Sequence, residues 1–247
     1  MKTTRLFDAH AHLQNYPDAG EMARTFERGA AEGVAITLCN GTNPGDWDKV
    51  LALASVHSGV LPFFGLHPWF AGTAAEGWLD SLEALLNRVP SGVGEIGLDK
   101  AVNGDFGRQE DVFRAQLKLS GKLERPAAIH CVQAWGRLEE ILKEERPTVF
   151  MLHAYGGSPE LMEGLACLGA YFSFNWEVSD PRREKMRKAL KAAPPERLLF
   201  ETEAPGPMSL AEIIRASAAI LGRSTEDLEE LAWRNAEKFL GRMFPKL

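Results

Sequence analysis

Cysteine, long hydrophobic runs and excess positive charge are all scarce in this sequence. The three cysteines among its 247 residues (Cys39, Cys131 and Cys167) form no C-x-x-C pair, which argues against a disulfide framework. No apolar run approaches the roughly 18 residues of a membrane helix, and the N-terminal MKTTRLFDAH lacks the apolar core of a signal peptide. We therefore expect a cytoplasmic protein without a membrane anchor.

The charge balance limits the kinds of partner. The formal net charge is -6 and the isoelectric point is about 5.6. A protein with this balance does not coat nucleic acid by charge alone. An enzyme that holds one phosphodiester through metal ions remains compatible with it, and no sequence feature indicates a protein partner.

The chain is rich in alternating strand and helix patterns. With 45% hydrophobic residues it has enough apolar surface for a sizeable core, and we expect residues 1–247 to form one domain. Mostly apolar runs, typical of strands buried on both faces, occur at 5–10, 34–40, 60–67, 92–99, 126–131, 148–154, 170–175 and 197–202. Helical patterns occur at 20–32, 44–57, 75–88, 106–123, 134–145, 158–167 and 181–191, and a helical tail covers 207–240.

Eight such alternations in one chain predict a single (β/α)8 TIM barrel of the α/β class. The extra C-terminal helices are expected to close the bottom of the barrel. An open, doubly wound sheet is the alternative that the same alternation allows.

Chemically versatile side chains follow the predicted strands. Five of the six histidines come at strand ends, and only His57 lies within a helical pattern. Because a TIM barrel builds its active site where strands end, these side chains are expected to meet at one rim. The converging set consists of His10, His12, Glu95, His67, His130, His153, Glu201 and Glu203.

Each element of this set also has a structural explanation. His10 and His12 lie two residues apart, so they point to the same side of a strand and can chelate a metal, although many such pairs only form hydrogen bonds. Glu95 lies inside the apolar run VGEIGL and needs a cation, which a distant Lys or Arg could also supply. The combination of imidazole and carboxylate favours Zn, Mn or Fe, and carboxylate-rich sites also hold Mg.

Seven short motifs stand out along the chain, namely DAHAHL (8–13), GLHP (65–68), GEIGLDK (94–100), RPAAIHC (125–131), HAYGG (153–157), LLFETEAP (198–205) and RNAEKFLG (234–241). Their order and spacing resemble the TatD-type metal-dependent deoxyribonucleases, a branch of the amidohydrolase-like TIM barrels. The resemblance covers nearly the whole chain, and the motifs are specific as a set.

The resemblance implies a site with two divalent metal ions, with Zn, Mg or Mn as candidates. His10 and His12 would hold one ion together with the acidic residue that ends strand 8, which is Glu203. Glu95 would bridge to the second ion.

By the same resemblance, His130 and His153 would hold the second ion, and His67 would contact the substrate phosphate. The family implies metal-dependent hydrolysis of phosphodiesters, commonly by exonuclease action on DNA, with a metal-activated water. DNA or another phosphodiester is therefore the expected partner, bound at the metal site.

One position departs from the family pattern in a way that affects catalysis. The family usually has Glu-Thr-Asp-x-Pro at strand 8, whereas this chain has Glu201-Thr202-Glu203-Ala204-Pro205. In the wider superfamily that Asp both binds metal and accepts a proton from the attacking water, so Glu203 and Glu95 are the catalytic candidates. Since Glu203 is longer by one methylene, either the loop retracts or hydrolysis is weakened.

Two alternative functions stay open. The same ligands could serve a small phosphate ester, amide or lactone, or the protein could be a metal-binding barrel with weakened catalysis. Candidate substrate contacts at the rim are Trp69, Trp135 and Trp176, which could stack on bases or simply pack in loops. Lys100 could meet a substrate phosphate, although a solvated loop charge explains it equally well.

Overall fold

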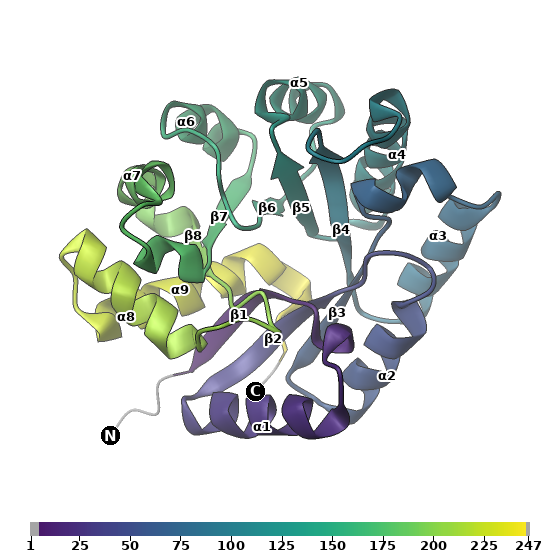
Figure 1. Ribbon diagram of the computed structural model, residues 1–247. Coiled ribbons are helices and arrows are strands. Elements are labelled where there is room, and N and C mark those ends of the chain that lie inside the picture. Colours follow the sequence, from purple (N-terminus) through teal and green to yellow (C-terminus); the bar gives the residue numbers. More distant parts are fainter. Residues whose placement is uncertain (1–4, 246–247) are drawn as a thin grey trace.

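A computed structural model describes residues 5–245 as a parallel β-barrel surrounded by helices (Figure 1). The eight strands follow one another around the sheet in sequence order, without the reversal of order that an open doubly wound sheet shows. The predicted TIM barrel is thereby confirmed. The strands are β1 (Leu6–Ala11), β2 (Val34–Asn40), β3 (Val60–Phe64), β4 (Gly92–Asp99), β5 (Ala127–Val132), β6 (Phe150–Leu152), β7 (Ala170–Phe174) and β8 (Leu198–Phe200).

The helices lie close to the predicted ranges. They are α1 (Ala19–Ala31), α2 (Trp47–Val56), α3 (Trp78–Arg88), α4 (Phe106–Leu123), α5 (Trp135–Glu145), α6 (Glu160–Cys167), α7 (Glu184–Ala192), α8 (Leu210–Leu221) and α9 (Thr225–Leu240). The tail predicted at 207–240 is thus two helices, because Gly222 adopts a left-handed conformation and Ser224 caps α9 by accepting from Asp227 N. Within residues 5–245, no helix is long and apolar enough to cross a membrane.

The barrel interior is apolar at the end opposite the histidines. Phe7 and Phe63 project from the strands into a buried cluster that α9 completes with Phe239. The rings of Phe63 and Phe239 stack with centroids 6.5 Å apart, and Tyr171 meets Phe239 edge-on at 5.4 Å. Of the two C-terminal helices, α9 therefore covers the bottom of the barrel, as expected, whereas α8 packs beside α7 and α9.

The first and last strands are joined by a few hydrogen bonds at the functional end. Glu203 N donates to His10 O at 3.1 Å, and His12 N donates to Ala204 O at 2.7 Å. Below them, the Asp8 carboxylate accepts from the backbone N–H of Thr202 at 2.9 Å and from its hydroxyl at 2.6 Å. The barrel is therefore closed by the same short segments that carry the predicted ligands.

Two buried glutamines of α4 fix neighbouring rim segments. Gln116 accepts from Leu66 N at 2.7 Å and donates to Leu66 O at 3.0 Å, next to His67. Gln109, two helical turns earlier, makes the same two contacts with the backbone of Asp99, at 2.8 and 3.0 Å. Each side-chain amide thus replaces a strand neighbour for backbone groups that would otherwise be buried without a partner.

Replacing Gln116 by Met is expected to destabilise the protein by about 2 kcal/mol or more, because the N–H and C=O of Leu66 lose their partners. The measurement is urea unfolding. Lys118→Met on the same helix is the control, since its side chain is 69% exposed and its loss changes stability by less than about 0.5 kcal/mol. Equal stability of the two variants would contradict the role assigned to Gln116.

Candidate metal centre

Five histidines surround the carboxylate of Glu95 at the carboxyl end of the barrel. We call Glu95 and these histidines the Glu95 centre. Two imidazoles face Glu95 Oε2 and three face Oε1, all at hydrogen-bond distance. The distances are 3.3 Å from His10 Nε2, 3.1 Å from His12 Nε2, 3.2 Å from His67 Nε2, 3.0 Å from His130 Nδ1 and 2.8 Å from His153 Nε2. All five histidines predicted to converge therefore do so, and His67 lies among them.

The centre is deeply buried, and its charges depend on one another. Glu95 is 2% exposed; burial disfavours its charge, yet the surrounding histidines hold its pKa well below the usual range. Burial acts against the charged form of His153 as well, but Glu95 and Glu203 raise the pKa of this imidazole well above its normal value. At His67 the burial dominates and lowers the pKa. The carboxylate and the imidazoles thus form one coupled set.

The donor atoms suit divalent metal ions. Four groups of three donors occur in the described chain, and within each group the donor atoms lie within 4.8 Å of one another. A metal ion bound at about 2.0–2.2 Å from nitrogen and oxygen brings its ligand atoms to similar separations. The groups are His10–His12–Glu203, His10–Glu95–His153, His67–Glu95–His130 and His153–Glu201–Glu203.

A second observation also fits a cation here. His10 is fully buried, and its Nδ1 has no hydrogen-bond partner among the described residues. Its Nε2 lies only 3.2 Å from His12 Nε2. Two imidazole nitrogens at this distance, both facing a carboxylate, are arranged as ligands of a common ion are.

Glu203 lies close both to His153 and to the pair His10 and His12. Its backbone adopts a left-handed conformation with φ +55°, which is uncommon for a residue with a side chain. Its Oε1 accepts from His153 Nδ1 at 2.8 Å, and it belongs to one donor group with His10 and His12. Burial opposes its charge, but His10 and His153 lower its pKa to about 2, so the carboxylate is ionised at neutral pH.

Carboxylates behind the histidines orient them. Asp99 Oδ2 lies 3.3 Å from His130 Nε2 and also accepts from Trp69 Nε1 at 2.7 Å. Glu201, fully buried, accepts from Ala154 N at 2.7 Å, directly after His153. Sequence reasoning did not assign Asp99 or Asp8 a role; the usable signal was that both are acidic residues in strands that carry ligands.

The candidate rim contacts differ in exposure. Trp69 is 61% exposed, whereas Trp135 and Trp176 are partly buried against the core. Tyr155, in the HAYGG motif, is fully buried and donates its hydroxyl hydrogen to Ser158 O at 2.8 Å, so it belongs to the core. Lys100 is exposed, and its ammonium lies 4.8 Å from the centroid of the Phe106 ring.

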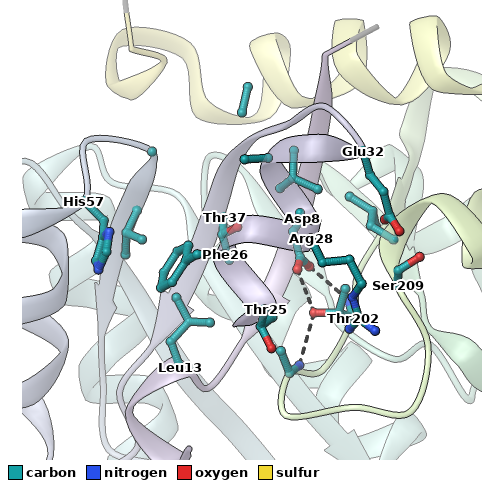
Figure 2. A pocket seen from close by; sticks show the side chains of 18 of the residues that line it. Asp8, Leu13, Thr25, Phe26, Arg28, Glu32, Thr37, His57, Thr202 and Ser209 are labelled. Carbon is teal, nitrogen blue, oxygen red and sulfur yellow. Dashed lines mark hydrogen bonds between the residues drawn. The ribbon is translucent and has the colours of Figure 1, made fainter. Parts of the chain in front are cut away.

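A separate cavity of about 420 Å³ lies between α1 and the outer wall of the barrel (Figure 2). Of the six histidines, His57 lines it, stacked on Phe26 with centroids 4.2 Å apart. Figure 2 shows Asp8 and Thr202 on its wall, joined by hydrogen bonds. The cavity therefore lies behind the strands that carry the ligands, and His57 is away from the Glu95 centre, as predicted.

Comparison with known proteins supports the resemblance to the TatD-type deoxyribonucleases. The sequence model of a family described as TatD related DNase matches residues 7–241. A relative in Escherichia coli K12, an uncharacterized metal-dependent hydrolase named YjjV, is 31% identical over 81% of this chain and 80% of its own length. A Klebsiella pneumoniae relative, the 3'-5' ssDNA/RNA exonuclease TatD, is 29% identical over 96% of this chain and 98% of its own length.

The fold is equally similar. The crystal structure of YjjV from E. coli superposes with a TM-score of 0.90 at 26% identity, covering 98% of this chain and 100% of that chain. The structure of a TatD family hydrolase from Entamoeba histolytica gives a TM-score of 0.85 at 18% identity, covering 98% and 99%. The second likeness concerns the fold alone.

Metal binding is expected to release protons near neutral pH. Burial lowers the pKa of His12, but the hydrogen bond and charge of Glu95 outweigh it and raise this pKa to about 8. His12 therefore carries a proton at about pH 7 in the metal-free protein, and a metal must displace it, so affinity falls as the pH drops below about 8. Titration calorimetry with Mn²⁺ in two buffers of different ionisation enthalpy measures the release, which is expected to be smaller at about pH 9. A heat independent of the buffer at about pH 7 contradicts the assignment.

Replacing Glu95 by Gln is expected to weaken Mn²⁺ binding by roughly 100-fold or more, because the shared carboxylate is lost while the side-chain shape is kept. Equilibrium dialysis with elemental analysis measures the bound metal. The control is Glu140→Gln on α5, whose side chain is 63% exposed and pairs with Arg137 at the surface. Equal metal content in both variants would show that the ions bind elsewhere.

Proposed function

The chain belongs to the TatD-related DNase family of metal-dependent hydrolases, and on this premise we propose that it hydrolyses phosphodiester bonds at the Glu95 centre. The single observation that carries the proposal is the burial of one carboxylate among five imidazoles, with Glu203 beside them. This donor set is of the kind that binds two divalent ions through a shared carboxylate.

The proposed arrangement assigns one ion to His10, His12 and Glu203. The second ion is assigned to His130 and His153, with Glu95 shared between the two. Zn, Mn and Mg are the candidate metals, since each accepts carboxylate ligands. When bound, such ions lower the pKa of water and neutralise charge on a phosphate.

The protein groups have separate tasks in this proposal. Glu203 is the proton acceptor for the attacking water, since its carboxylate lies beside the proposed metal ligands His10 and His12 and His153 fixes its position. His67 is the phosphate contact; its geometry also allows metal ligation, because its Nε2 lies 3.2 Å from Glu95 Oε1. Asp99 holds the His130 ring in place.

The proposed substrate is nucleic acid, preferentially DNA, cleaved as an exonuclease. Support comes from the Klebsiella relative, which is named as a 3'-5' exonuclease of single-stranded DNA and RNA. We also propose that residues 1–247 act as one domain in the cytoplasm, which agrees with the three free cysteines.

The test is incubation of metal-stripped protein with end-labelled single-stranded DNA, with and without Mn²⁺, Mg²⁺ or Zn²⁺. Metal-stimulated release of nucleotides is expected for the native protein and for Glu140→Gln, and a loss of at least about 100-fold is expected for Glu95→Gln. Parallel assays with a chromogenic phosphodiester, a monoester and a lactone report the class of bond. Cleavage of the lactone alone would replace this proposal by the small-substrate alternative.

A second candidate function, a metal-binding barrel with weakened catalysis, is favoured by one residue, Glu203. We expect Glu203→Asp to lower kcat by about 100-fold, since the shorter side chain withdraws the carboxylate from His153 by roughly 1 Å. Steady-state kinetics at saturating metal measure the change. A variant more active than the native chain would instead support weakened catalysis through Glu203.

A further inference from the structure

Trp69 is an exposed aromatic side chain at the rim of the barrel. Within residues 5–245 only two large hydrophobic side chains are strongly exposed, Trp69 at 61% and Val56 at 72%. Val56 ends α2 and borders the separate cavity behind the strands. Trp69 lies in the short 3-10 helix Pro68–Thr73, two residues after His67 of the Glu95 centre.

The exposed indole is nevertheless held in place from two sides. Its Nε1 donates to Asp99 Oδ2 at 2.7 Å, and its backbone N–H donates to His67 Nδ1 at 3.2 Å. The ring meets the His67 ring edge-on, with centroids 4.9 Å apart and an interplanar angle of 83°. A fixed ring has lost most of its rotational freedom before any ligand arrives, so less entropy is lost on binding.

The indole is also tied directly to the proposed metal ligands. The oxygen that accepts from Trp69, Asp99 Oδ2, lies 3.3 Å from His130 Nε2. On the other side, His67 Nε2 lies 3.2 Å from Glu95 Oε1. Trp69 therefore contacts His67 of the Glu95 centre directly and is linked to His130 through Asp99.

We propose that Trp69 is the stacking platform for one unpaired nucleobase of a strand whose phosphodiester lies at the Glu95 centre; this rests on the proposed function. A flat, partly desolvated indole face fits any of the bases, because every base has a π-face. Within a duplex both faces of a base are covered by its neighbours, so an accessible face belongs to an unstacked base. The platform thus selects single strands and frayed ends over internal duplex positions.

Asp99 is a positioning residue in this arrangement. By accepting from both Trp69 and His130 through one oxygen, it fixes the distance between the stacked base and the metal ligands. A base seated on the indole therefore brings a particular phosphate, at a set distance along the strand, to the Glu95 centre.

The experiment compares two fluorescently labelled strands of equal length and backbone, one of thymidines and one abasic, both with hydrolysis-resistant phosphorothioate links. Fluorescence anisotropy gives their affinities for the Mn²⁺-loaded protein. The native chain is expected to bind the base-bearing strand roughly 5- to 100-fold more tightly, the equivalent of one stacked base. In Trp69→Ala this preference is expected to disappear, while affinity for the abasic strand and for Mn²⁺ is unchanged.

Two further variants separate stacking from structural effects. Trp69→Phe keeps an aromatic face without the N–H to Asp99, so it is expected to retain part of the preference. Val56→Ala truncates the other strongly exposed hydrophobic residue and is expected to bind both strands as the native chain does. Equal weakening of both strands by Trp69→Ala, or the same preference in Trp69→Ala as in the native chain, would overturn the proposal.

Hydrolysis of bis(4-nitrophenyl) phosphate tests the phosphodiesterase activity separately from the role of Trp69. If the native chain hydrolyses it but does not prefer the base-bearing strand, the Trp69 platform is wrong and the phosphodiesterase proposal stands. If no phosphodiester is hydrolysed with any of the metals, the proposed function fails and the platform with it.

Discussion

The buried carboxylate of Glu95 is the constraint on which the rest of this structure depends. An ionised carboxylate at 2% exposure is costly unless positive charge compensates it, and the structure surrounds it with five imidazoles. Imidazoles packed this closely repel one another once protonated. Protons on the histidines therefore balance the carboxylate only at the cost of repulsion among the rings. Divalent cations would resolve both problems, since they replace protons on the imidazoles and balance the carboxylate.

The fold brings these residues together at the carboxyl end of the barrel. Six of the eight strands (β1, β3, β4, β5, β6 and β8), or the loops that follow them, supply the residues of the Glu95 centre and Glu203. The barrel closes through Glu203 N, which donates to His10 O, and through the hydrogen bonds of Thr202 to Asp8. Strain in this closure would be transmitted to Glu203 and His10, which lie on it. The side-chain amides of α4 hold the loops after β3 and β4 in the same manner. Stability and metal geometry therefore share the same hydrogen bonds.

Much of this organisation could be predicted from the sequence, because buried strands and helices have distinct periodicities and a TIM barrel gathers strand ends. The barrel, the convergence of all five histidines and the separation of His57 are confirmed. The support by Asp99 was missed, since the contact between Trp69 and Asp99 spans 30 residues and leaves no periodic signal. The sequence also does not show that Trp69 is exposed while Trp135 is partly buried, because this difference depends on how the loops pack. The roles of the individual ligands stay predictions.

The most direct measurement of the central claim is an anomalous difference map from crystals grown with saturating Mn²⁺. The account predicts two peaks that share Glu95, one beside His10 and His12 and the other beside His130 and His153. Glu203 would contact the first peak. A Glu95 centre without any peak under these conditions, or Mn²⁺ bound only elsewhere on the protein, would contradict the account.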